Sequence, residues 1–486
     1  MKDYSFGNHI CALRVGRGLS QFQLGTLVGV TDKAVSKWEN GDARPRVSTC
    51  YRLAEVLGVS ISELLSCEQR VTTSARKELD RMNKELWKKA YERLWDIYGD
   101  RPPMLCWSRL ASEEAALNGT DAIQSIAVLG RIEEEAKKRN RTTIATGAVN
   151  SSFVAWLLGA TKVDPLPPHY RCPKCKKTEF VSEVRDGFDL RPKRCSCGAM
   201  FDRDGHDIPF EGYAKLVCGQ PGAEVRVPDG FRSAAVKVLS DFYEGTAEVL
   251  PVKVEERETG WSSERYVVLP LGKEKPQVAS DGFWHTDFDT YWDWHGDEPV
   301  YHFPSNKQLD EIEAADRPLP DVSKLIGADM AEQVFRVRKE TAASIAEAVE
   351  PDEPHDFDLL IRIDGLSHAT GAWEGNGKQL VQSKQAAFRM LPAVCEDVWD
   401  AVVKGVRGKG VYDHGLALQV MENARRGKYS DHGMPENVEA LLHTLGLPDW
   451  YPDHLRKIRY LFPKGHCVAY LIAEMIHRWV CADGSV

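Results

Sequence analysis

Four cysteines in the middle of the chain impose the tightest constraint on how it can fold. Cys172 and Cys175 form a CxxC pair, and Cys195 and Cys197 follow as CxC within RCSCG. Two short cysteine turns of this kind supply four thiolates to one zinc ion, and such a site organises a loop that is too small to bury a core. Because the protein fills all four positions of the ion, the spacing predicts a structural zinc site. Four free thiols are the alternative.

The remaining cysteines and the N-terminus indicate a reducing compartment. The chain has 12 cysteines, but those outside the cluster are scattered, and the opening MKDYSFGNHICALRVGRG lacks the apolar core of a secretion signal. Disulfides persist mainly in oxidising compartments, so we expect a cytoplasmic protein with reduced thiols. The sequence has no apolar run of about 18 residues, which argues against a membrane partner.

Residues 1–66 show the pattern of five short helices. Leu24 and Val28 fall at helical spacing, Gly29 ends that helix, and Thr31 can cap the next one. Over its full length this segment resembles the Cro/repressor-type (XRE) helix-turn-helix family. The resemblance implies binding to double-stranded DNA, and the net charge of −9 means that this binding must rely on local basic patches. A protein-binding version of the fold is the alternative.

The same resemblance implies which side chains meet the DNA. Gln21, at the start of the second helix, would donate to a phosphate. The recognition helix would present five residues to the major groove: Thr31, Asp32, Lys33, Ser36 and Lys37. Lysine suits guanine or phosphate, and aspartate suits the amine of cytosine. Because a single copy of such a domain binds weakly, we expect a homodimer.

A strongly amphipathic segment follows at residues 75–98. Its apolar positions recur at helical spacing: Leu79, Met82, Leu86, Ala90, Leu94 and Ile97. We expect a helix here, within a linker that covers residues 67–105. Its apolar side either packs on the core of the chain or pairs two copies of it.

Segments around and beyond the cysteines carry a second resemblance. VDPLPPHYRCPKCKKTEF, GFDL, RCSCG and DGHDIPFEGY lie within roughly residues 140–215. HDFDLLIRIDGLSHATGAWEGN, LALQVMENARRGK and PDWYPDHLRKIRYLFPKGHCVAYLIAEMI lie within roughly residues 350–477. In this order the two blocks resemble the palm and the end of the fingers of the PolC-type DNA polymerase III α subunit, the family C bacterial replicative polymerase.

The two resemblances together imply a multidomain chain. An all-α helix-turn-helix domain at 1–66 and a linker helix at 67–105 would precede an α+β, degenerate PolC-like palm at 106–345, with a zinc knuckle at 170–200. A mainly α region of fingers and helix–hairpin–helix elements would follow at 346–486.

The loop that holds the triphosphate in this family departs from the family pattern. It corresponds to ATGAVNSSFVAW, where Thr146 stands in place of an arginine, Ala148 in place of a serine and Asn150 in place of a glycine. A hydroxyl group cannot replace a guanidinium group on phosphate. We therefore expect weakened binding of a nucleoside triphosphate.

The metal-binding acids of the family are also degraded. Counted from Pro221, the paired aspartates fall on Gly222 and Glu224, and the third acid falls on about Tyr301. Two magnesium ions need converging carboxylates, so Glu224 is left as a weak catalytic candidate. A shift of one position nominates Asp229, which has no partner acid two residues away.

Contacts of the fingers with DNA are better preserved. DGLSHAT resembles a helix–hairpin–helix turn, in which Gly365 and Ser367 would bind the DNA backbone. YLFPKGHCVAY resembles the family's nucleotide-contacting helix, with Lys464, His466 and Tyr470 as the candidates. Basic residues surround these elements: Arg362, Lys404, Arg407, Lys409, Arg425, Arg426, Lys428, Arg456, Lys457 and Arg459. A solvated surface that is inherited but unused is the alternative.

An acidic and aromatic segment lies at residues 281–302 and contains His285 and His295. It fits either a new metal site or a hairpin packed by its aromatic rings with a wet acidic face.

We expect a DNA-binding protein derived from a PolC-type polymerase and catalytically inactive, a pseudoenzyme with zinc as a structural cofactor. It would regulate transcription or interfere with DNA replication, with replication proteins as possible partners. The alternative is an active DNA-directed DNA polymerase, a nucleotidyltransferase, which would also need magnesium.

Overall fold

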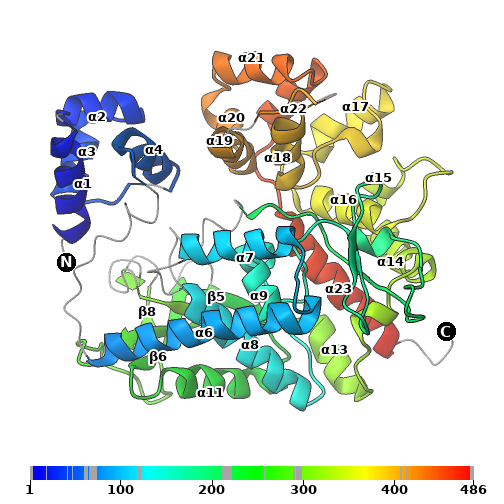
Figure 1. The fold of residues 1–486 in the computed structure, drawn as a ribbon, viewed down its shortest axis with the longest axis horizontal. Helices are drawn as coiled ribbons and strands as arrows, with labels where there is room; N and C mark the ends of the chain where they lie inside the picture. The colour runs from blue at the N-terminus through cyan, green and yellow to red at the C-terminus, as the bar shows by residue number, and fades with distance from the viewer. Residues whose placement is uncertain are drawn as a thin grey trace.

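The computed structural model describes residues 4–17, 19–40, 42–45, 47–59, 64, 74–117, 122–210, 222–256, 259, 261–287, 290–291, 298–405, 408–411 and 414–481. Its N-terminal part is helical, its middle part combines helices with two sheets, and its C-terminal part is helical (Figure 1). This order agrees with the fold class expected from the sequence. The exact domain boundaries remain predictions. Among the described helices, none is both long and apolar enough to cross a membrane.

The N-terminal helices are α1 (Tyr4–Gly16), α2 (Gln21–Val28), α3 (Asp32–Glu39) and α4 (Val47–Leu57). Ser20 caps α2 through the N–H of Gln23, Gly29 ends it with φ of 77°, and Thr31 caps α3. Their apolar sides form one small core around the fully buried Leu24 and Val35. Apart from Leu64, the fifth helix expected from the sequence lies outside the described residues.

Four α-helices and one 3-10 helix surround the first strand of the main sheet in the chain: α6 (Ser74–Tyr98), α7 (Met104–Leu117), α8 (Ala122–Lys138), η1 (Gly147–Ser151) and α9 (Phe153–Leu157). The apolar side of α6 packs on α8 and α9, with Ala90 and Leu94 fully buried. The amphipathic helix expected from the sequence is therefore confirmed as an element of this core. Pairing of two chains through it stays a prediction.

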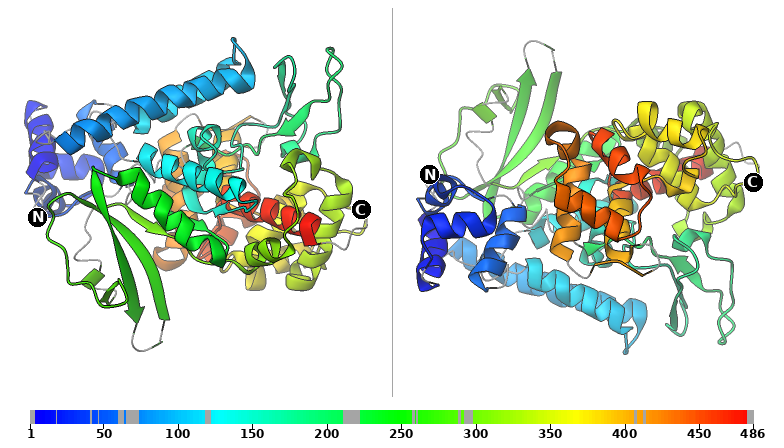
Figure 2. Two further views of the ribbon diagram at one scale, coloured as in Figure 1. Left: turned by 90° about the horizontal axis from the view of Figure 1, so that it is seen from below. Right: turned by 90° about the horizontal axis from the view of Figure 1, so that it is seen from above.

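The main sheet has six strands in the order β1-β5-β9-β7-β6-β8. They are β1 (Ile144–Ala145), β5 (Gly222–Arg226), β6 (Ala247–Glu256), β7 (Trp261–Pro270), β8 (Trp284–Thr286) and β9 (Val300–His302). One face packs on α8 and α11 (Arg232–Tyr243). β6 and β7 form a long hairpin that projects from the body (Figure 2).

The cysteine segment has a sheet of its own, in the order β3-β2-β4. Its strands are β2 (His169–Arg171), β3 (Thr178–Phe180) and β4 (Asp202–Asp204), with η2 (Gly187–Asp189) between β3 and β4. These strands have only three residues each, so the segment has little core of its own.

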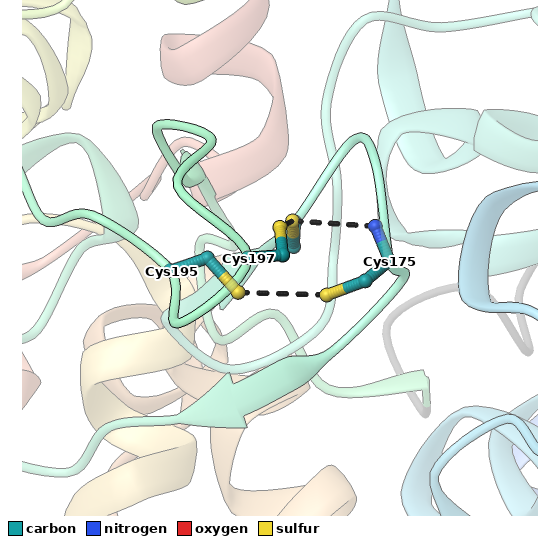
Figure 3. A group of neighbouring side chains, drawn as sticks. Cys175, Cys195 and Cys197 are labelled. Carbon is teal, nitrogen blue, oxygen red and sulfur yellow. Dashed lines mark hydrogen bonds between the residues drawn. The ribbon is translucent and has the colours of Figure 1, made fainter.

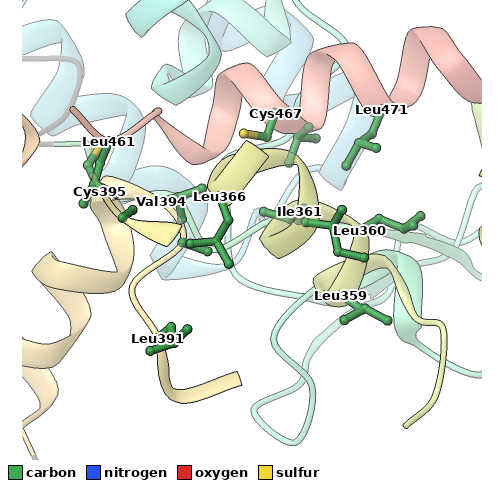
Figure 4. Close-up of a cluster of buried hydrophobic side chains, with 14 of the residues drawn as sticks. Leu359, Leu360, Ile361, Leu366, Leu391, Val394, Cys395, Leu461, Cys467 and Leu471 are labelled. Carbon is green, nitrogen blue, oxygen red and sulfur yellow. The ribbon is translucent and has the colours of Figure 1, made fainter. Parts of the chain in front are cut away.

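The C-terminal part packs helices around α23 (Lys464–Cys481), which runs through its centre (Figure 1). Apolar residues of α16 (Phe357–His368) face α23 in the largest core of the chain, including Leu360, Leu366 and Leu471 (Figure 4). The other elements from the sheet onward are η4 (Asp229–Phe231), α13 (Lys307–Ala315), η5 (Val322–Lys324), α14 (Ala328–Thr341), α15 (Ala343–Ala346), η6 (Trp373–Gly377), α17 (Lys378–Gln382), η7 (Phe388–Met390), α18 (Cys395–Lys404), α19 (His414–Arg425), α20 (Lys428–His432), α21 (Glu436–Thr444) and α22 (Trp450–Lys457).

The helix–hairpin–helix turn predicted at DGLSHAT, residues 364–370, is wrong, because α16 continues through His368. Gly365 lies inside that helix, and a Cβ atom there would stand 2.4 Å from the carbonyl oxygen of Ala393. The glycine thus permits close packing of α16 on the 393–394 segment. Ser367 is exposed, and its hydroxyl donates to the carbonyl of Asp364. Because Gly365 lies inside α16, its N–H is used within the helix.

Candidate functional site

Helix α3 presents the side chains expected to read DNA. Asp32, Lys33 and Lys37 are exposed, and Ser36 is half-buried. The hydroxyl of Thr31 accepts a hydrogen bond from the N–H of Ala34 at 3.2 Å and so fixes the start of the helix. The five residues therefore share one short helix, with its polar side outward. Whether they contact DNA remains a prediction.

Gln21 has a partner within the protein. Its amide Nε2 donates to Oε2 of Glu39 at 2.7 Å, and Nη2 of Arg14 donates to the same oxygen at 2.9 Å. Burial raises the pKa of the Glu39 carboxyl, but the hydrogen bonds from Arg14 and Gln21 outweigh it and hold that pKa below its usual value. This cluster ties α1, α2 and α3 together and sets the orientation of α3.

The four cysteine sulfurs converge as the spacing predicts (Figure 3). All four lie within 4.8 Å of one another, with Cys172 to Cys197 at 3.4 Å and Cys175 to Cys195 at 3.5 Å. These separations exceed a disulfide bond and suit four thiolates around one zinc ion. Burial opposes ionisation of Cys172, but the N–H of Cys175 and the thiol of Cys197 lower its pKa to about 6. The residues therefore fit a structural zinc ion.

Glu224, which the sequence analysis aligned with one of the polymerase acids, is surrounded by protein donors. Its Oε1 is 3.2 Å from Oγ1 of Thr146 and 3.2 Å from Nη2 of Arg226. Its Oε2 is 3.0 Å from Nδ1 of His302. Burial raises the pKa of the Glu224 carboxyl, but the hydrogen bond from His302 and the charge of Arg226 hold it below its usual value. Both oxygens of this carboxylate are thus engaged within the protein.

Tyr301, the approximate position expected for the third acid, does not face Glu224. Tyr301 is fully buried on the opposite face of the sheet, where its hydroxyl lies 3.1 Å from that of Tyr243. Successive side chains of a strand alternate between faces, and the residue in register with Glu224 is His302. Sequence reasoning missed His302 and Arg226. The signal that could have identified His302 is the alternation of apolar and polar residues in VYHFP, where a buried tyrosine turns the following histidine to the other face of the strand.

The other two acid positions do not supply a second ligand. Gly222 has φ of 125°, and a Cβ atom there would stand 1.9 Å from the carbonyl oxygen of Val300. Asp229 is exposed in η4, where it accepts from the hydroxyl of Ser305 at 2.9 Å and pairs with Arg232 at 3.0 Å. Of the four nominated positions, Gly222, Glu224, Asp229 and Tyr301, Glu224 is therefore the one with a carboxylate next to Thr146.

The loop expected from the sequence to bind the triphosphate has its donors engaged by side chains of the protein itself. The buried carboxylate of Glu113 accepts from the N–H groups of Phe153 and Val154 at 2.8 and 2.9 Å and from the hydroxyl of Ser152 at 2.9 Å. The amide of Asn150 donates to the carbonyl of Ala145 at 2.8 Å. An internal anion thus occupies the start of α9, where N–H groups would otherwise be available to phosphate.

Helix α23 carries the three residues expected to contact nucleotide or DNA, and two of them lie on the side of Glu224. The rings of His466 and Tyr470 stack at 4.8 Å, and, besides burial, the charges of Glu224 and Arg226 act on the pKa of both side chains. Burial lowers the pKa of the His466 imidazole. Lys464 lies elsewhere: it is buried, and its ammonium group donates to the carbonyls of His206 and Arg185.

Part of the expected basic surface is neutralised inside the protein. Arg362 is buried between Asp358 at 3.0 Å and Asp397 at 3.4 Å, so it is not a surface charge. Lys404 pairs with Asp207 at 3.1 Å and with Asp400 at 2.9 Å. The remaining ion pairs in this set join Arg425 and Arg426 to Glu422, and Arg456 to Glu439 and Asp453. Arg407 lies outside the described residues. Lys409, Lys457 and Arg459 are exposed.

In the acidic segment at 281–302, His285 lies apart from His302 and has acidic neighbours of its own. His285 lies 2.7 Å from Asp281 through Nε2 and 3.4 Å from Glu255 through Nδ1. Tyr291 packs in a small core with the hairpin, as the aromatic interpretation expects. Within the part of the chain that is described, the four cysteines alone form a group that can hold a metal ion. His295 lies outside that part.

Comparison with known proteins supports both resemblances. A helix-turn-helix family model matches residues 12–64. The chain is 25% identical over 478 positions to "DNA polymerase III PolC-type" of Listeria welshimeri, covering 81% of this chain and 32% of that protein. Proteins of the same name from Streptococcus thermophilus and Thermotoga petrophila are each 27% identical, over 82% and 85% of this chain. The chain spans about a third of the length of these relatives.

Proposed function

We propose that this chain is a DNA-binding protein with a polymerase-derived body that no longer performs metal-dependent nucleotidyl transfer. It acts as a regulator of transcription or as a factor that interferes with replication. The observation that carries the loss of catalysis is the engagement of Glu224, whose two oxygens meet Thr146, Arg226 and His302.

A two-metal mechanism needs several carboxylates that converge on two divalent ions. Here the neighbours of Glu224 are a guanidinium group and an imidazole. A fixed positive charge at Arg226 repels a magnesium ion, and Gly222 has no ligand atom. The residues present therefore do not fit the magnesium pair of an active palm.

The start of α9 supports the same proposal. Glu113 accepts hydrogen bonds from the N–H groups of Phe153 and Val154, so these donors are already used within the protein and are not available to a triphosphate. Thr146 lacks the charge that would bind phosphate. The metal and the nucleotide, the two partners of the transfer reaction, thus both meet groups that are already engaged within the protein.

DNA binding rests on α3, which carries exposed Lys33 and Lys37 on a helix fixed by the cluster around Glu39. A homodimer would place two such helices on two half-sites. Replication proteins are the further partners we propose, through a body that resembles the PolC-type polymerase. Zinc is the structural cofactor that we assign to the four cysteines.

The deciding experiment is primer extension next to duplex binding. The purified zinc-loaded chain is incubated with a primed template, magnesium and all four deoxynucleoside triphosphates, and binding to duplex DNA is measured on the same preparation. We expect binding without extension. Extension that is lost in Glu224→Ala would overturn the proposal in favour of the second candidate, an active DNA-directed DNA polymerase, which the 25–27% identity to PolC-type proteins favours.

A further inference from the structure

Three side chains on one face of the main sheet form a continuous hydrogen-bonded relay. Oγ of Ser263 lies 3.1 Å from Nε2 of His302, and Nδ1 of the same ring lies 3.0 Å from Oε2 of Glu224. A serine on one ring nitrogen and a carboxylate on the other is the arrangement that makes a serine hydroxyl nucleophilic. Neither DNA binding nor nucleotidyl transfer requires it.

The sheet topology explains how residues so far apart in sequence meet. β9 lies between β5 and β7, and Glu224 is in register with His302. Tyr266 is in register with Tyr301 in the antiparallel β7–β9 pair, so His302 lies opposite residue 265 and diagonal to Ser263. Diagonal neighbours on one face are within reach of long side chains, and the imidazole spans the gap.

The contacts of its two ring nitrogens hold the His302 imidazole in an orientation that suits a general base. With Nδ1 protonated, it donates to the Glu224 carboxylate, and Nε2 is then free to accept the proton of the Ser263 hydroxyl. Arg226 and Thr146 bind the other carboxylate oxygen and keep Glu224 ionised beside the ring. The carboxylate therefore both orients the imidazole and stabilises the imidazolium that forms when it takes a proton.

We propose that Ser263 is a nucleophile that accepts the acyl group of small activated esters. The hydroxyl oxygen of Ser263 attacks the ester carbonyl carbon and passes its proton to Nε2 of His302. The carbon–oxygen bond to the leaving alcohol breaks, and the proton goes to that leaving group or to solvent. Water then attacks the acyl-serine, with His302 again accepting the proton, and releases the acid and the free serine.

Burial limits the class of substrate. Ser263 is 8% exposed, whereas the side chains of His302 and Glu224 are 21% and 35% exposed. Ser263 is therefore the most buried of the three residues, and Glu224 is the most exposed. Because Ser263 is almost completely buried, we assign the smallest common acyl group, acetyl, as the one that is transferred.

The experiment uses the full zinc-loaded chain with p-nitrophenyl acetate. We expect release of nitrophenolate and one acetyl group on the peptide that contains Ser263, identified by mass spectrometry. Ser263→Ala should lose this modification, and His302→Gln should slow acetylation about 100-fold or more. Glu224→Gln, which keeps the shape but not the charge, should also slow it about 10-fold or more.

Ser262→Ala is the matched control, because Ser262 is the exposed neighbour on the other face of β7 and should be acetylated no differently from the parent chain. Duplex binding by α3 and the circular dichroism spectrum report folding in each variant. Acetyl groups found only on lysines or cysteines, or equal labelling of the Ser263 peptide in the parent chain and in His302→Gln, would show that the relay is structural and overturn the proposal. Neither result bears on primer extension, so the two proposals fail separately.

Discussion

Glu224 and His302 face each other across neighbouring parallel strands, with Nδ1 of the imidazole 3.0 Å from Oε2 of the carboxylate. In this chain a protein donor thus stands beside the carboxylate where the related polymerases would be expected to bring a metal ion. In the function that we propose, this pair withdraws the carboxylate from metal binding, and the same imidazole connects it to Ser263.

Gly222 should be intolerant of any side chain. Gly222→Ala adds a Cβ atom 1.9 Å from the carbonyl oxygen of Val300 at a φ of 125°, and we expect a loss of at least about 2 kcal/mol in the free energy of unfolding. Urea denaturation measures it. Gly147→Ala is the control, since φ there is also positive, at 78°, but nothing lies within 4 Å. Equal losses in both variants would contradict the close approach of β5 and β9.

Lys33 and Lys37 should contribute to DNA binding through charge. We expect Lys33→Ala and Lys37→Ala each to weaken duplex binding, and a lysine that contacts phosphate should lower the slope of log affinity against log salt by about 1. Fluorescence anisotropy at several salt concentrations measures both effects. Lys89→Ala, at an exposed position on α6, should bind as the parent chain does. Unchanged affinity in both α3 variants would favour a protein-binding helix-turn-helix.

Removing the metal should disorder the cysteine segment. We expect one zinc ion per chain by elemental analysis, and a chelator or Cys172→Ser should release it, because the short strands β2, β3 and β4 have little core without it. Proteolysis between residues 170 and 200 should then become faster. Cys106→Ser, at a buried cysteine outside the cluster, should keep its zinc. Four thiols that react fully without a chelator would rule out the site.

Stability should fall in mild acid through His454. Burial and then Lys457 lower the pKa of this imidazole to about 4, below its ordinary 6.5, and its Nδ1 lies 2.8 Å from Oδ1 of Asn376. The unfolded chain binds the proton first, so this contribution is complete above pH 6.5 and is lost as the pH falls towards 4, by about 3 kcal/mol at most. Thermal unfolding of the parent and His454→Gln between these limits tests it. His443→Gln, at an exposed site, is the control. A parallel pH dependence in the parent and His454→Gln would exclude His454 as the source.

Several features could be predicted from sequence because their causes are local. The spacing of Cys172, Cys175, Cys195 and Cys197 fixed the cluster, and Gly29 and Thr31 marked the ends of α2 and α3. The amphipathic pattern of α6 and the overall order of helical, mixed and helical parts were also readable. Each depends on residues within a few turns of one another, where periodicity, capping and ligand spacing act directly.

The site itself depended on contacts that sequence spacing does not encode. Tyr301 and His302 are adjacent in the chain, yet strand alternation buries the first and turns the second towards Glu224, almost 80 residues earlier. Lys464 and His466 share one helix, but Lys464 reaches the carbonyls of His206 and Arg185 whereas His466 lies on the side of Glu224, because a step of two residues rotates a side chain by roughly half a turn. The sequence determined the elements and the zinc ligands. Only the packing of distant strands and of α23 decided which side chains surround Glu224, because long-range register follows from burial of whole faces and not from any local pattern.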